Sequence, residues 1–413
     1  MKLPRMILAG LVMAAPVHVL DGGTIDSPFL SSLRAEAARN HPAVQAAALE
    51  AGAAARDVAA VRLWDDPMVG LMFMAAPQMM RREEGDIRVM AEQTLPQPGV
   101  YQAQREKAEA LRRAELQGTR IPVLAAGAVA AKNAVELALV DESIRLQQGQ
   151  LEWLRQMVRN AAEQAVNPDA TSVDALRLES ELAREIEILE SARRTRESLA
   201  KRLNLSLGRP LERAWPELRL PPSPVPVPVG AAEVARIPHV NPEVLAMRRR
   251  VDAARAETRI ADRERQPRFS VGVQGNMYSG GNFNSAEVGV RMTLPWFNEP
   301  SYRARVDAAA LRADASAADV GTMVRDLSAE VLDRANEAAN AAAQARAYGG
   351  EILEKSTGAA RTVEGAWISR TSSLAELLEA NRFLFSIRLE QRRFIAMQLA
   401  ALEDLHLLVP TQP

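Results

Sequence analysis

The chain has 413 residues, a net charge of −1 at neutral pH and no cysteine, which excludes disulfide bonds, thiolate metal sites and a lipid anchor on cysteine. Basic and acidic residues are interleaved along the chain, so its charge gives no support for a nucleic-acid partner. Aromatic residues make up only 4% of the chain, and most of the sequence is rich in Ala, Leu, Glu and Arg. This composition predicts a mostly α-helical protein.

The N-terminus has the pattern of a secretory signal peptide. Lys2 and Arg5 precede an apolar run of about ten residues from Met6 to Ala15, too short to span a bilayer. We therefore expect residues 1–22 to be a signal peptide that exports the chain from the cytoplasm, with a buried first helix as the alternative. No later segment approaches 18 uninterrupted apolar residues, so we expect no transmembrane helix in the exported chain.

The sequence repeats itself at a separation of about 200 residues. Each repeated position suits a boundary between elements, since Asn or His before Pro begins a helix and Thr/Ser-x-x-Asp/Glu forms a capping box. The matched pairs are His41-Pro42 with Asn241-Pro242, Pro67 with Pro267, Thr94-Leu95-Pro96 with Thr293-Leu294-Pro295, Tyr101 with Tyr302, and Thr171-x-x-Asp174 with Ser373-x-x-Glu376. We infer a first repeat over residues 31–208, a proline-rich linker over 209–240 and a second repeat over 241–408.

Each repeat contains two segments that alternate with the period of a β-strand. We predict strands over residues of about 68–76 and 86–94 in the first repeat, and of about 268–277 and 286–294 in the second. Strands of about nine residues can cross a bilayer at a steep tilt. On each strand, the alternate residues that carry no charge should face lipid. These residues are Val69, Leu71, Phe73, Val89, Phe269, Val271, Val273, Val288 and Val290. Four antiparallel strands cannot close a barrel, so the chain should oligomerise.

Two segments keep a helical pattern for roughly 65 residues, which corresponds to a length on the order of 100 Å. They run from Gln97 to about residue 164 and from Pro300 to about residue 365, with a kink expected at Pro122 in the first. The returning helices carry apolar seams typical of coiled-coil packing. The seam residues are Leu178, Leu182, Ile186 and Leu189 in the first repeat and Leu384, Ile387, Phe394 and Met397 in the second.

Nothing in the sequence indicates an enzyme. The four histidines, His18, His41, His239 and His406, are scattered without metal-ligand spacing. No nucleotide-binding or nucleophile motif is found, and the glycine-rich stretch at 280–284 lies at a hairpin tip rather than before a helix. We therefore expect no catalytic residues and no cofactor.

The doubled His/Asn-Pro helix starts, the Thr-Leu-Pro strand ends and the segment SLAELLEANRFL at 373–384 together resemble the TolC-like outer-membrane factor family. The resemblance covers residues of about 31–408 and is nearest to the branch paired with heavy-metal efflux pumps. It implies a tandem repeat of helix, strand, strand, long helix and helix. Three such chains would form a 12-stranded outer-membrane β-barrel that continues into a long periplasmic α-helical barrel.

The resemblance also implies a function. The chain would be the passive exit duct of a tripartite efflux system, a homotrimer in outer-membrane lipid that docks onto a periplasmic adaptor and an inner-membrane RND-type pump, with heavy-metal ions as one candidate cargo. The sequence departs from the family in having no lipidated cysteine. It also has Arg370 and Pro168 where relatives often have glycine before the returning helix. The alternative function is a periplasmic coiled-coil scaffold or adaptor without a pore, which would not need uncharged strand faces.

Three groups of residues are candidates for functional roles. The alternate strand residues on the opposite, polar side should line the pore. The candidates are Arg88, Glu92, Gln274, Glu287 and Arg291. The turns at 166–171 and 366–373 should form the periplasmic tip, whose charged groups are Asp169, Asp174, Arg370 and Glu376. Six of the 15 methionines lie in or near the first predicted hairpin, and four share the lumen-facing parity, namely Met68, Met72, Met74 and Met90. Thioethers are soft ligands that suit Cu(I) and Ag(I), although methionine is also an adaptable packing residue.

Overall fold

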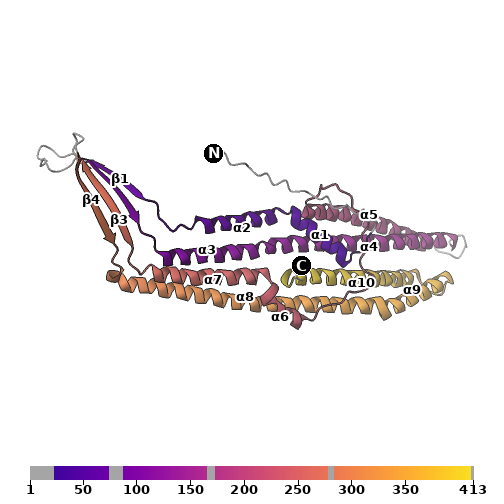
Figure 1. Ribbon diagram of the computed structural model, residues 1–413. Helices are drawn as coiled ribbons and strands as arrows, with labels where there is room; N and C mark the ends of the chain where they lie inside the picture. The colour runs from indigo at the N-terminus through magenta and orange to yellow at the C-terminus, as the bar shows by residue number, and fades with distance from the viewer. Residues whose placement is uncertain (1–22, 74–86, 165–172, 278–282, 411–413) are drawn as a thin grey trace.

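The computed structural model describes residues 23–73, 87–164, 173–277 and 283–410, and it shows an elongated molecule with a β-sheet at one end and the junction of α9 and α10 at the other (Figure 1). The predicted signal peptide, residues 1–22, lies outside the described residues. The first half contains α1 (Ser27–Asn40), α2 (Pro42–Ala60), β1 (Met68–Phe73), β2 (Ile87–Thr94), α3 (Pro98–Gly118), α4 (Arg120–Gln164) and α5 (Val173–Leu207).

The second half follows the same order with one more interruption. It contains α6 (Gly230–Val240), α7 (Pro242–Arg263), β3 (Phe269–Met277), β4 (Phe283–Met292), the 3₁₀-helix η1 (Pro295–Asn298), α8 (Glu299–Ala347), the π-helical turn η2 (Tyr348–Ile352), α9 (Leu353–Ile368) and α10 (Leu374–Leu408). The fold is therefore mostly α-helical with a small β part.

The expected helix starts before Pro42 and Pro242 are present. The His41 Nδ1 atom accepts a hydrogen bond from the Ala43 amide at 3.2 Å, and the Asn241 side chain accepts from the amides of Glu243 and Val244. These caps satisfy amides that have no partner inside the helix. Both repeated positions therefore begin a helix for the same physical reason.

The two long helices are each broken. The first is interrupted at Thr119, as expected from Pro122, which has no amide hydrogen to donate to the carbonyl of Gly118. The second is helical from Glu299 to Ile368, in agreement with the helical pattern over 300–365, but it contains a π-helical turn at Tyr348–Ile352 that was not predicted. At Gly349 a Cβ atom would lie 2.3 Å from the Gln391 Nε2 atom on α10, and Gly350 leaves helical geometry with φ −100° and ψ −120°. The chain therefore forms a π-helical turn here so that α10 can approach closely.

Helix packing depends largely on alanine. The largest core cluster joins α1, α4, α5 and α10, and many of its buried members are alanines whose small side chains allow the helices to lie close together. The predicted seams are only partly correct. Leu178, Leu189 and Ile387 are buried, but Ile186 and Met397 are 42% and 46% exposed. A straight α-helix drifts away from a strict seven-residue repeat, which turns these two positions outward.

The proline-rich segment between the halves is held against the helices by buried polar side chains. Asn204 donates to the carbonyls of Leu211 and Arg213 at 3.0 and 2.8 Å, and Gln398 bonds both backbone groups of Val225. The Asp141 carboxylate accepts from the Leu218 amide at 2.8 Å. The last part of the expected linker, from Gly230 to Val240, forms helix α6.

Among the described residues, one helical stretch, Pro98–Glu163, contains a window long and apolar enough to cross a membrane, and 56% of that window is buried against its neighbours. The window includes the alanine-rich start of α4, which packs against α1 and α10. A core helix has the same composition, so this feature fits the helical packing seen here.

The end of α5 depends on a glycine. Gly208 has φ +68°, and a Cβ atom there would lie 2.8 Å from Cβ of Asn40. We predict that Gly208→Ala lowers the stability by about 1–3 kcal/mol, because a left-handed conformation is strained for alanine and Asn40 must move. Gly358→Ala is the matched control, since that helical glycine has nothing within 4 Å of a Cβ position. A thermal unfolding midpoint that fell equally in both variants would contradict this account.

Candidate functional site

The four strands form one antiparallel sheet with the order β1-β2-β3-β4, so β2 and β3 join the two repeats and β1 and β4 are its edges (Figure 1). Directly paired residues point to the same face of a sheet. Leu71 pairs with Val89, Ala91 with Val273, and Val273 with Val288, which extends one apolar face across all four strands.

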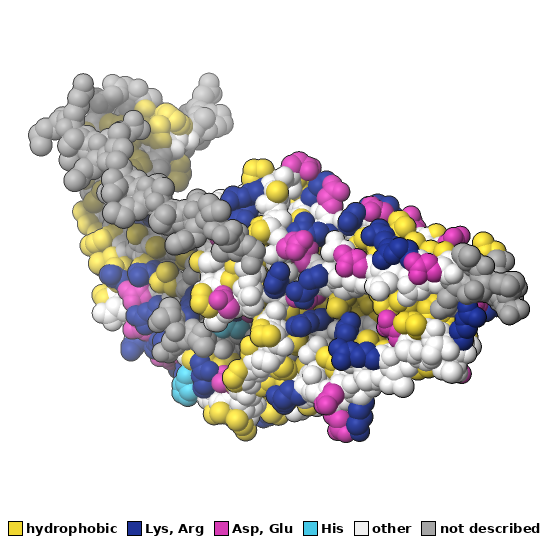
Figure 2. Space-filling model, turned by 90° about the vertical axis from the view of Figure 1, so that its right-hand side faces the viewer, with side chains coloured by type: hydrophobic (Ala, Val, Ile, Leu, Met, Phe, Trp, Pro, Cys, Tyr) yellow, Lys and Arg dark blue, Asp and Glu magenta, His cyan; other side chains and the backbone are white. Residues whose placement is uncertain are grey.

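Among the described residues, none covers this apolar face. Val69 and Val288 are each 76% exposed, and the other members expected to face lipid share their face of the sheet. An exposed apolar patch of this kind marks a surface that meets lipid or a partner. The surface of the helices is different, because acidic and basic side chains are intermingled there (Figure 2).

The opposite face carries a hydrogen-bonded polar network. The Glu92 carboxylate accepts from the Ser270 hydroxyl at 2.6 Å and forms an ion pair with Arg291. Asn276 accepts from Arg88 Nε at 3.1 Å, and it donates to the Glu287 carboxylate at 3.3 Å. The network thus ties β2 to both β3 and β4.

All five candidates for pore-lining residues lie on this polar face. Gln274 pairs with Glu287 across β3 and β4, and its side-chain Nε2 donates to the Asn276 Oδ1 atom at 3.4 Å. Sequence reasoning missed the residues that bridge the charged groups, namely Ser270, Asn276 and Ser285. Their shared strand parity was the signal that could have found them.

Three methionines of the first hairpin lie on the same polar face. Met68 is paired with Glu92, Met72 with Arg88, and Met90 with Gly70. Met74, the fourth candidate, lies outside the described residues.

The junction of α9 and α10 lies at the end of the molecule opposite the sheet (Figure 1). Arg370 has φ +64°, a left-handed conformation that glycine adopts more easily. Its amide donates to the Trp367 carbonyl at 3.0 Å, and the Thr371 amide donates to the Ala366 carbonyl at 2.8 Å. The turn is therefore closed by backbone hydrogen bonds despite the arginine.

The expected capping box at Ser373 and Glu376 is present. The Ser373 hydroxyl accepts from the Glu376 amide, and the Glu376 carboxylate accepts from the Ser373 amide at 3.0 Å. The Ser372 hydroxyl also donates to this carboxylate. These donors hold the pKa of the Glu376 carboxyl below its ordinary value.

Of the other candidates for the periplasmic tip, the structure describes Asp174 but not Asp169. Asp174 lies in the first turn of α5, where a carboxylate favours the positive end of the helix dipole. Asp169 and Thr171 lie outside the described residues. Beneath both helix starts, Trp367, Leu374 and Leu178 form a buried cluster that fixes the ends of α9, α10 and α5 against each other.

Buried charges join the two repeats midway along the helices. Arg34 on α1 donates from Nε to the Glu403 carboxylate on α10 at 2.9 Å, and Glu403 is buried. Burial and the nearby Arg34 lower the pKa of His406. Asp141 is also buried, and desolvation raises the pKa of its carboxyl although Arg196 and the Leu218 amide donate to it. The buried carboxylates of Glu403 and Asp141 therefore each have hydrogen-bonding partners that explain their burial.

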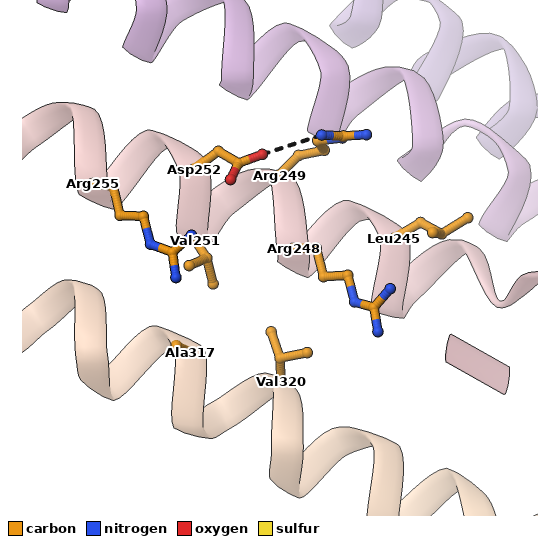
Figure 3. Close-up of a pocket in the computed structure, with 8 residues that line it drawn as sticks. All are labelled: Leu245, Arg248, Arg249, Val251, Asp252, Arg255, Ala317 and Val320. Atoms are coloured by element: carbon orange, nitrogen blue, oxygen red, sulfur yellow. Dashed lines mark hydrogen bonds and ion pairs between the residues drawn. The ribbon is translucent and has the colours of Figure 1, made fainter. Parts of the chain in front are cut away.

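A cavity of about 510 Å³ lies between α7 and α8 and is lined by Leu245, Arg248, Arg249, Val251, Asp252, Arg255, Ala317 and Val320 (Figure 3). Arg249 pairs with Asp252 at 3.2 Å, and Arg248 donates to the Pro238 carbonyl at 2.8 Å. The lining has no nucleophile beside a base. No group of three metal-binding His, Cys, Asp or Glu side chains occurs in the described part of the chain.

Comparison with known proteins now identifies the architecture. Residues 238–409 match the family described as outer membrane efflux protein. No curated protein matches the chain by sequence.

Solved outer-membrane channels share the fold over nearly the whole chain. The structure of CusC aligns with a TM-score of 0.77 and 14% identity, over 93% of this chain and 92% of its own. The outer-membrane channel OprN aligns with a TM-score of 0.75 and 18% identity, over 93% and 90%. The outer-membrane protein VceC of Vibrio cholerae aligns with a TM-score of 0.72 and 15% identity, over 91% and 95%. The first half therefore has this fold as well.

The capping box at the start of α10 predicts a pH dependence at this end of the molecule. Because the pKa of Glu376 is lowered on folding, its contribution is complete above the ordinary carboxyl pKa and is lost as the pH falls through the lowered value. The protection of the first-turn amides of α10 against hydrogen exchange, relative to their intrinsic exchange rates, should fall over that acidic range. Glu376→Gln should remove the pH dependence while keeping a capping partner. An unchanged pH profile in that variant would contradict the assignment.

Proposed function

We propose that the chain is the exit duct of a tripartite efflux system, in which three copies form a 12-stranded barrel in the outer membrane and a helical tunnel in the periplasm. The observation that carries this proposal is the four-stranded sheet with one bare apolar face, one hydrogen-bonded polar face and two open edges. In a bilayer every backbone group must be paired, so such a sheet has to close with other copies.

The proposed trimer follows from the sheet and the fold. One copy supplies four strands, and three copies would supply twelve, with β1 of one copy pairing with β4 of the next. The apolar face would then contact lipid, and Arg88, Glu92, Gln274, Glu287 and Arg291 would line the lumen. The family match to outer membrane efflux proteins and the likeness to solved outer-membrane channels support this arrangement.

The proposed partners are a periplasmic adaptor and an inner-membrane RND-type pump. We place the docking surface at the junction of α9 and α10 and the start of α5, farthest from the sheet. Asp169, Asp174, Arg370 and Glu376 would supply its charges. The left-handed Arg370 supports the choice, because a strained backbone at an exposed tip indicates a constraint other than stability.

The proposed role is passive transport without catalysis. The pump would set most of the substrate range, and the mixed charges of the polar face favour hydrated solutes and ions over apolar ones. Heavy-metal ions are our proposed cargo class. A periplasmic scaffold without a pore is disfavoured because it would leave Val69, Val288 and their neighbours exposed to water.

The orientation of the sheet gives a direct prediction. Val271 lies on the apolar face, paired with Val290, and Gln274 lies on the polar face, paired with Glu287. Val271→Arg should cost roughly 2–4 kcal/mol if it lies near the bilayer midplane, whereas Gln274→Arg should be tolerated in a wet lumen. The measurement is the yield of folded trimer in outer membranes, checked by conductance in planar bilayers. A lower yield for Gln274→Arg than for Val271→Arg would contradict this orientation and would indicate that the polar face, not the apolar face, contacts lipid.

The tip gives a second prediction. Removing charge with Asp169→Asn and Arg370→Gln should change single-channel conductance or crosslinking to the adaptor, because these groups would lie where the tunnel narrows and docks. Arg346→Gln on α8 is a matched control at an exposed arginine remote from the tip. Identical conductance and crosslinking in the tip variants and the control would rule out a role in gating or docking.

A further inference from the structure

Three methionines are gathered on the polar face of the first hairpin. Met68 and Met72 lie on β1, two residues either side of Gly70, and Met90 on β2 is the direct partner of Gly70. Residues two apart on a strand share a face, as do direct partners, so all three thioethers project from the same side. Diagonal neighbours in a sheet are about 7–8 Å apart, which long side chains can bridge.

Gly70 makes room for this arrangement. A Cβ atom at Gly70 would lie 2.9 Å from Cγ and 3.1 Å from Sδ of Met90. The Met90 side chain therefore lies over the backbone of Gly70, between Met68 and Met72. A larger residue at position 70 would displace the Met90 sulfur from this position.

The charged residues of β2 are engaged on the other side. Arg88 reaches Asn276 on β3, and Glu92 reaches Ser270 on β3 and Arg291 on β4. These contacts turn the charged groups away from β1. The polar face over the described part of β1 therefore presents Met68, Gly70 and Met72, with Met90 reaching in from β2.

Simple packing does not explain the methionines on β1. Met68 and Met72 are 62% and 53% exposed on a face that otherwise carries charged and polar groups. A methionine that fills a core gap is surrounded by apolar atoms. Here the sulfur atoms of β1 remain open to whatever occupies the polar side of the sheet.

We propose that Met68, Met72 and Met90 form a binding site for a soft monovalent cation, with Ag(I) and Cu(I) as its ligands. Thioether sulfur is a soft, uncharged donor that selects such ions over Mg²⁺, Ca²⁺ and other hard cations. Three neutral donors without an anionic ligand hold the ion loosely. The proposal rests on the proposed function only in placing this face toward the lumen, where ions would pass.

Arg88 supplies the positive charge on β2; it lies two residues from Met90 on the same face and is the direct partner of Met72. It disfavours a bound cation through charge repulsion. Replacing it with glutamine should therefore strengthen binding of the cation. At a separation of several ångströms in a wet site, the expected gain in affinity is about two- to threefold.

The test is titration of the purified full-length protein in detergent with Ag(I), in chloride-free buffer, with bound metal quantified after separation of free ion. The triple variant Met68→Leu, Met72→Leu and Met90→Leu keeps size and apolarity but removes sulfur. The matched control is Met277→Leu, Met292→Leu and Met397→Leu, which changes two methionines on the apolar face and one exposed methionine on α10.

The triple variant should bind one equivalent of Ag(I) per protomer less than the unmodified protein, and the control should bind the same amount as the unmodified protein. Arg88→Gln should bind that equivalent more tightly. Equal Ag(I) binding by the triple variant and the control would overturn the site.

Trimer mass and conductance, measured on the same samples, separate this proposal from the proposed function. Conducting trimers without a difference in Ag(I) binding would overturn the methionine site alone. Site-specific Ag(I) binding by a protein that neither trimerises nor conducts would support the site and overturn the pore.

Discussion

The open edges of the sheet are the constraint on which the rest of the molecule depends. In the described part of the chain, β1 and β4 each pair with a single neighbouring strand, and one face of the sheet is apolar and exposed. Water could satisfy the edges but not the apolar face, while hydrocarbon could cover the face but not the edges. Closing the sheet with further copies in a bilayer resolves both demands at once. The polar network on the other face then has a wet lumen to face.

The helices place the sheet far from the charged turns. Alanine-rich packing lets α1, α4, α5 and α10 lie close together without bulky side chains, which suits the wall of a long tube. Buried polar groups then fix the parts that alanine cannot orient. Asn204 and Gln398 hold the segment between the repeats, and the Arg34–Glu403 pair joins the first repeat to the second.

Much of this organisation was predictable because it depends on local chemistry. Alternation along β1 and β3 sets the faces, and proline placement sets the starts of α2 and α7 and the break near Pro122. The π-helical turn at Gly349 was not predicted, because it depends on how closely Gln391 of α10 approaches. The pair Gly349–Gly350 was a visible signal of a kink.

The polar face of the sheet was also predictable only in part. Strand parity predicted that Arg88, Glu92 and Glu287 would share a face, since parity is a property of each strand alone. The role of Asn276 as a bridge between β2 and β4 required the register of three strands, and so did the position of Met90 over Gly70. Register follows from pairing between distant segments, which a single sequence does not display.

The central claim is that β1 of one copy pairs with β4 of the next. The chain contains no cysteine, so engineered cysteines give an unambiguous signal. Leu71→Cys on β1, combined in turn with a cysteine at each β4 position from 285 to 291, should yield a disulfide-linked trimer under oxidising conditions for the pairs that lie opposite each other. Each single-cysteine variant should give no disulfide-linked trimer. Only monomers for every pair, or an open-ended ladder of larger species, would contradict the account.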